Sequence, residues 1–114
     1  MKDSDSKLIY ETYVDRSGGE AFDLVQTLMR SGRYKISNHQ RDEVTEAWNI
    51  HIMHTDYPIV IELFGRKDIV AYVKIEHRDP FTAPEAPPKM REFSQPIDAT
   101  DIISKLIEIT RDFD

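Results

Sequence analysis

Apolar and polar residues alternate along three consecutive segments in the middle of the chain, which predicts three β-strands. In the segments 48–53, 59–64 and 69–76 every second residue is apolar, the period of a strand with one face against a core. Residues 8–14 are rich in β-branched and aromatic side chains and predict a further strand, as does the short segment 33–37. We assign to the core face of the three alternating strands Trp48, Ile50, Ile52, Ile59, Ile61, Leu63, Ile69, Ala71, Val73 and Ile75.

Two other segments have the period of amphipathic helices. The first is predicted over 18–31, because Ser17–Glu20 has the spacing of a capping box and Gly32 supplies a stop signal. The second follows Asp98 or Thr100, either of which can cap it. Its apolar stripe consists of Ile102, Ile103, Leu106, Ile107 and Phe113.

The predicted elements follow one another in the order β-α-β-β-β-β-α, which defines the α+β class. An antiparallel sheet of four to five strands with both helices packed on one face is the economical way to bury their apolar sides. We expect one domain over 1–114, with a polar tail at 1–6 and a proline-rich loop at 78–97, because the run 79–88 can form neither a helix nor a central strand. The expected core combines Phe22, Leu28, Trp48, Ile50, Ile61, Leu63, Val73, Ile103 and Leu106.

The core faces restrict the register of the first two alternating strands. Opposing residue numbers in an antiparallel pair have a constant sum, and a shift by one residue turns every side chain to the other face. Even-numbered core residues in one strand and odd-numbered ones in the next require a loop of even length, here Thr55–Pro58. This register places Ile52 opposite Ile61 and His51 opposite Glu62.

The same argument applies to the second and third alternating strands. Both are assigned odd-numbered core residues, so their loop has an odd length and is predicted to be Arg66–Asp68. Glu62 then lies opposite Tyr72, and Phe64 lies opposite Val70. The face away from the helices carries the polar line His51–Glu62–Tyr72 and an apolar surround formed by Met53, Val60, Phe64 and Val70.

Composition narrows the possible environments and partners. The chain of 114 residues contains no cysteine, which excludes disulfides and thiolate metal sites. Its net charge of −6 disfavours nucleic acid and anionic lipid as partners. No segment has the ~20 apolar residues of a membrane span, and the polar segment 1–6 does not resemble a secretory signal. We therefore expect a cytoplasmic protein.

Two patterns resemble ligand sites, and both are better explained as structure. His51, His54 and Asp56 have metal-like spacing, but residues three apart on a strand point to opposite faces, so no metal site is predicted. Gly18–Gly19 precedes a helix as anion-binding loops do, but Glu20 occupies the first turn where a phosphate would lie. No cofactor is expected.

Two further patterns suggest macromolecular partners. The segment 84–89 contains a PxxP motif with a nearby lysine, which suits grooves for extended peptides, although a loop packed along its own domain is favoured. Arg30, Arg33, Lys35 and Arg41 surround Tyr34, as in readers of single-stranded nucleic acid. That basic cluster is diluted by Asp42, Glu43 and Glu46.

The leading hypothesis is a non-enzymatic interaction domain of the adaptor, chaperone, inhibitor or immunity type. It would bind a protein partner, or itself as a homodimer, through an open sheet face that is too apolar for a purely solvated surface. One alternative is a small-molecule-binding domain or enzyme that uses the imidazole, carboxylate and phenol of the polar line, and another is a nucleic-acid binder that uses the surface from Arg30 to Arg41. The residues assigned to partner binding are Met53, Val60, Phe64, Val70 and Tyr72, and those assigned to the alternative catalytic site are His51, Glu62 and Tyr72.

Overall fold

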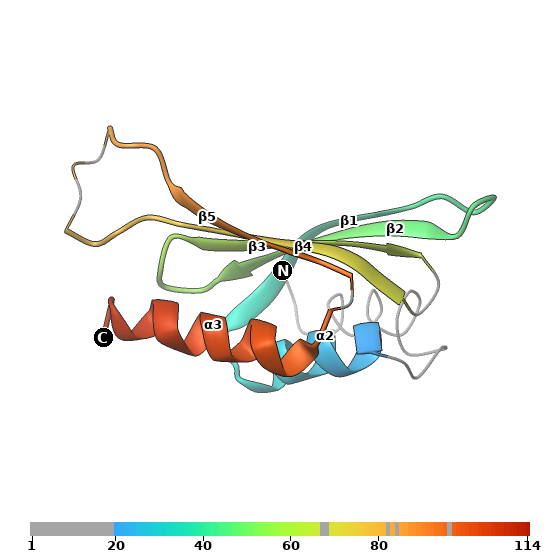
Figure 1. The fold of residues 1–114 in the computed structure, drawn as a ribbon, viewed down its shortest axis with the longest axis horizontal. Helices are drawn as coiled ribbons and strands as arrows, with labels where there is room; N and C mark the ends of the chain where they lie inside the picture. Colours follow the sequence, from blue (N-terminus) through green and yellow to red (C-terminus); the bar gives the residue numbers. More distant parts are fainter. Residues whose placement is uncertain (1–19, 67–68, 82, 84, 96) are drawn as a thin grey trace.

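The computed structural model contains one antiparallel sheet with two helices against one of its faces (Figure 1). It describes residues 20–66, 69–81, 83, 85–95 and 97–114, so the predicted strand at 8–14 and most of the predicted capping box lie outside the described part. The sheet has the order β1-β2-β3-β4-β5 and confirms the α+β class. Its elements are α2 (Glu20–Arg30), β1 (Tyr34–Arg41), β2 (Ala47–His54), β3 (Ile59–Arg66), β4 (Ile69–His77), β5 (Lys89–Ser94) and α3 (Ala99–Arg111).

Both helices begin or end where local chemistry requires. Gly32 follows α2 with a φ of 72°, a left-handed conformation that favours glycine after a helix. Asp98 caps α3, because its side chain accepts a hydrogen bond of 2.8 Å from the backbone N–H of Thr100. No helix among the described residues is long and apolar enough to cross a membrane.

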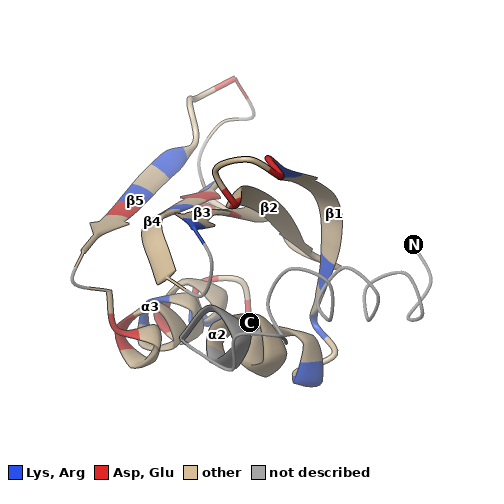
Figure 2. Cartoon of the chain, turned by 90° about the vertical axis from the view of Figure 1, so that its right-hand side faces the viewer, with Lys and Arg blue, Asp and Glu red and all other residues tan. Residues whose placement is uncertain are grey.

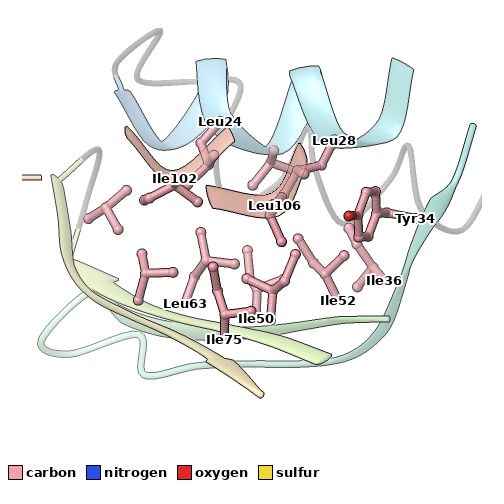
Figure 3. Close-up of a cluster of buried hydrophobic side chains, with 14 of the residues drawn as sticks. Leu24, Leu28, Tyr34, Ile36, Ile50, Ile52, Leu63, Ile75, Ile102 and Leu106 are labelled. Atoms are coloured by element: carbon pink, nitrogen blue, oxygen red, sulfur yellow. The ribbon is translucent and has the colours of Figure 1, made fainter. Parts of the chain in front are cut away.

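The core lies between the helices and the sheet (Figure 3). The stripe of α3 that faces the sheet is formed by Ile102, Leu106 and Ile109, whereas the predicted stripe residue Ile107 is 50% exposed and was wrongly assigned. Ile103 is only partly buried at the margin of the core, and the side chain of Phe22 lies outside the described part. The other expected core residues are buried: Leu28, Trp48, Ile50, Ile61, Leu63, Val73 and Leu106.

The predicted register of β2 and β3 is confirmed. Ile52 lies opposite Ile61, Ile50 lies opposite Leu63, and His51 lies opposite Glu62. The core faces determine this register because both strands alternate regularly between buried and accessible residues.

The predicted register of β3 and β4 is wrong by two residues over most of its length. Glu62 lies opposite Lys74 rather than Tyr72, and the register shifts between Phe64 and Gly65. This irregularity adds one residue to β4 and reverses its alternation near the hairpin, so Val70 is buried in the core and Ile69 is 49% exposed. Arg66 pairs with Ile69, in place of the predicted three-residue loop. Ala71 is exposed, contrary to its assignment to the core.

The ends of the sheet also extend beyond the prediction. β1 continues to Arg41, beyond the predicted strand 33–37, through a register shift between Ile36 and Asn38. β5 occupies the second half of the predicted proline-rich loop and pairs antiparallel with β4. It forms an edge of the described sheet, the position in which a strand needs little apolar alternation of its own. The described residues of the proline-rich segment before β5 form no helix or strand, and an ion pair of 3.2 Å joins Lys89 to Asp79.

Candidate interaction face

We define the open face as the side of the sheet away from α2 and α3, on which the described residues include no helix (Figure 1). The register arranges its side chains from β2 to β5 in three rows. The first row is Met53, Val60, Glu76 and Met90; the central row is His51, Glu62, Lys74 and Glu92; and the third row is Asn49, Phe64, Tyr72 and Ser94.

The central row is a chain of ion pairs across three strands. The Nε2 atom of His51 lies 2.7 Å from Oε2 of Glu62, and Nζ of Lys74 lies 3.2 Å from Oε1 of the same carboxylate. Lys74 also lies 3.3 Å from Glu76 in the neighbouring row. The amide of Asn49 donates to Glu62 at 3.3 Å. These contacts leave the carboxylate of Glu62 well satisfied within the chain.

The environment of Glu62 stabilises its charged form. Desolvation of the carboxylate opposes ionisation, but hydrogen bonds from Lys74, His51 and Asn49 outweigh it and hold the pKa of Glu62 below its usual range. The carboxylates of Glu62 and Glu76 correspondingly raise the pKa of Lys74. Groups of the chain itself therefore hold Glu62 and Lys74 in their charged forms.

Apolar side chains flank this row on both sides. Met53 and Phe64 are each 39% exposed, and Met90 is 50% exposed. The rings of Phe64 and Tyr72 lie 5.7 Å apart and form an aromatic pair across β3 and β4. Contact of such apolar side chains with water raises the free energy of the protein, which favours a surface that becomes covered.

The predicted polar line is only partly formed. The structure brings His51 and Glu62 together, but Tyr72 lies in the next row beside Phe64. Burial raises the pKa of the Tyr72 phenol, and its hydrogen bond to Glu92 raises it further. The predicted apolar surround also loses Val70, which points into the core.

An open depression of about 470 Å³ lies at one end of the sheet, and its composition bears on the alternative of a small-molecule site. Its lining does not include His51 or Glu62, the imidazole and carboxylate of the alternative catalytic site. This depression is therefore not a concave site built around those two residues. The lining comprises Gln40, Arg41, Asp42, Ala47, Trp48, Asn49 and Phe64.

The basic cluster is divided among different surfaces. Arg33 lies 3.5 Å from the Asp114 carboxylate and above the ring of Tyr57. Lys35 lies opposite Met53, and Arg41 lies opposite the buried Trp48. Figure 2 shows the basic residues of α2 and β1 at separate positions. A continuous basic stripe is not formed by these residues.

The histidines singled out for metal spacing are separated by the sheet. His54 is buried, and its Nδ1 accepts hydrogen bonds of 3.0 Å from the backbone N–H groups of Asp56 and Tyr57. Its ring stacks on Tyr57, with centroids 4.6 Å apart. Within the described residues, no three histidine, aspartate or glutamate side chains are grouped to hold a metal.

The sequence prediction misaligned one residue of the open face and missed three. The predicted register placed Lys74 opposite Val60 because the irregularity in β4 was not detected, and Met90, Glu92 and Ser94 fell within the predicted loop 78–97. The prolines before β5 concealed the strand, whereas the run from Lys89 to Ser94 contains none and carries a signal for extended structure only at Met90 and Phe93.

Comparison of the chain with protein-family models, curated proteins and solved structures found no match.

Proposed function

We propose that this protein is an interaction domain that binds a protein partner through the open face. The observation that supports it most is the arrangement of Met53, Phe64 and Met90, which remain 39–50% exposed on both sides of the ion-paired residues His51, Glu62 and Lys74. A partner can cover these three residues without leaving any of them as an unpaired buried charge, which lowers the cost of burying ionic groups in an interface.

A matched pair of substitutions tests the proposal. Phe64→Glu places a charge in the third row of the open face, at an aromatic residue of the kind in which interfaces concentrate their binding energy. Phe81→Glu makes the same chemical change at a residue that is 90% exposed in the loop before β5. Both variants should retain the circular dichroism spectrum and unfolding midpoint of the parent.

The wild type and both variants are then used as baits in extracts of cells that contain the protein, with quantitative mass spectrometry. The proposal predicts at least one protein, which can be this chain itself, that the wild type and Phe81→Glu retain in equal amounts. Phe64→Glu should retain at least about tenfold less of it, equivalent to ~1.4 kcal/mol of binding free energy. Identical retained sets for all three baits would contradict it.

A further inference from the structure

The open face is complementary in charge to itself when it is turned about one particular axis. Along the central row from β2 to β5 the residues are His51, Glu62, Lys74 and Glu92, so basic and acidic groups alternate. Reversal of this order places every basic group over an acidic one. A two-fold axis parallel to the strands, midway between β3 and β4, produces that reversal for two sheets packed face to face.

From this complementarity, and resting on the proposed function of the open face, we infer that its partner is a second copy of this chain, related by that axis. Glu62 lies over Lys74 of the second copy and Lys74 over its Glu62. His51 lies over the second Glu92. Both signs of charge are visible on the sheet in Figure 2.

The flanking rows agree with the same axis. Rotation about an axis parallel to the strands keeps each side chain at its level, so Phe64 lies over Tyr72 of the second copy and Tyr72 over its Phe64. The two aromatic pairs, each with centroids 5.7 Å apart within one copy, then form a cluster of four rings. In the first row, Met53 lies over Met90 of the second copy. Met53, Phe64 and Met90 are thus covered by apolar or aromatic partners, whereas Val60 lies over Glu76 of the second copy.

An axis across the strands gives a different result. If the two-fold axis ran along the central row, each strand would lie over its own copy. Glu62 would then face Glu62, and Lys74 would face Lys74, which repels at short range. The charges therefore distinguish between the two symmetric ways of stacking the same face.

The size of the face predicts the strength of the dimer. Four strands at a spacing of about 4.8 Å and three rows at about 6.8 Å cover roughly 400 Å² per copy. That area lies at the small end of specific interfaces, where complexes are weak and transient. The dimer should therefore form reversibly, with dissociation constants in the micromolar range or above.

Thiol cross-linking tests the axis directly, because the wild type contains no cysteine. Facing sheets lie about 10 Å apart, which is too far for a disulfide, so a short bismaleimide is the appropriate reagent. With the inferred axis, position 53 lies about 10 Å from position 90 of the second copy but about 17 Å from its own copy, since β2 and β5 are separated by three strand spacings.

Met53→Cys mixed with Met90→Cys should therefore cross-link at least about threefold more than either variant alone. Ile107→Cys, at a residue 50% exposed on α3 on the opposite side of the sheet, serves as the control and should give only background. Cross-linking of each variant with itself that equals the mixture would overturn the inferred axis.

Sedimentation equilibrium of the wild type over ~10 μM to ~1 mM provides the independent measurement, which needs no substitution. A rise in mean mass toward the dimer, abolished by Phe64→Glu and retained by Phe81→Glu, supports the inference. A monomer at ~1 mM overturns it. The proposed function is contradicted separately, by a bait experiment that shows no dependence on Phe64. If the protein is a monomer but still captures another protein through Phe64, only the inference that the partner is a second copy is overturned.

Discussion

Gly65 lies at the β3–β4 hairpin in a position where adding a single methyl group should lower the free energy of unfolding. A Cβ atom added there would lie 2.3 Å from Cζ2 of Trp48 and 2.4 Å from the carbonyl oxygen of Ile69. The backbone of Gly65 does not lie in the left-handed region, so alanine is conformationally acceptable. In the absence of the clash, Gly65→Ala should stabilise the fold by ~0.4–1 kcal/mol, through the lower entropy of the unfolded chain.

The clash should reverse that sign. Overpacking a well-packed interior costs ~1–3 kcal/mol when neighbours can shift, and here one neighbour is a backbone oxygen next to the hairpin connection. The other neighbour is an indole that is only 4% exposed and has little free space. We therefore expect Gly65→Ala to lower the free energy of unfolding by ~2–3 kcal/mol, at the upper end of this range.

Urea denaturation followed by far-ultraviolet circular dichroism measures this change. Trp48→Phe removes the indole atoms nearest the added methyl, so the double variant should recover ~1 kcal/mol relative to the sum of the single changes. Gly32→Ala is the control, because it is strained by a φ of 72° but has no atom within 4 Å of its added Cβ. Its loss should be independent of Trp48.

A stable Gly65→Ala variant would refute the argument. A loss below ~0.5 kcal/mol would mean that the indole and the hairpin move freely, contrary to the buried packing of Trp48. Equal losses with tryptophan or phenylalanine at position 48 would show that the cost arises elsewhere.

Three further predictions concern the core, a helix cap and the dependence of stability on pH. Leu106→Ala, at a residue 3% exposed, should lower the free energy of unfolding by ~2–5 kcal/mol in urea titration, and a loss below ~0.5 kcal/mol would remove α3 from the core. Asp98→Ala should cost ~0.5–2 kcal/mol in the same assay, while Asp98→Asn, which keeps the hydrogen bond to Thr100, should cost less. Burial is the main cause that lowers the pKa of both His54 and His77, with nearby cations adding to it, so their stabilisation is complete above the unfolded pKa of ~6.5 and is lost as pH falls through the lower folded values. The unfolding midpoint should therefore decrease as the pH is lowered from 7.5 to 5.5. In His54→Asn the amide oxygen can still accept hydrogen bonds from the loop backbone, so a smaller decrease in this variant would assign part of the effect to the His54 ring. Midpoints independent of pH would contradict the prediction.

The sequence predicted the register of the regular pair β2 and β3 correctly and that of β3 and β4 wrongly, because an irregularity intervenes in the second pair. Ile50, Ile52 and their partners in β3 gave a unique register, because only one set of alternate residues in each strand was strongly apolar. In β4 both alternate sets are apolar near the hairpin, so Ile69 and Val70 were equally plausible core residues. The structure selects Val70, through an extra residue that parity arguments treat as absent.

The prediction of the candidate site was correct where it depended on the register of β2 and β3 and wrong where it depended on that of β3 and β4. The contact between His51 and Glu62 followed from the regular pair of strands and is confirmed at 2.7 Å. The partner of Glu62 on its other side was wrong, because it depended on the irregular pair. The row therefore contains an imidazole, a carboxylate and an ammonium group in place of the predicted imidazole, carboxylate and phenol.

The edge strand β5 has a consequence for the behaviour of the protein at high concentration. Exposed edges can recruit the same strand from another molecule and lead to aggregation. In an antiparallel pair of β5 strands only residues on the same face can lie opposite each other. The two registers that pair most of the strand centre on Arg91 or on Glu92, and each places that charge against its own copy. Like-charge repulsion therefore disfavours pairing between the β5 strands of two molecules, so contacts at this edge should be weak and reversible.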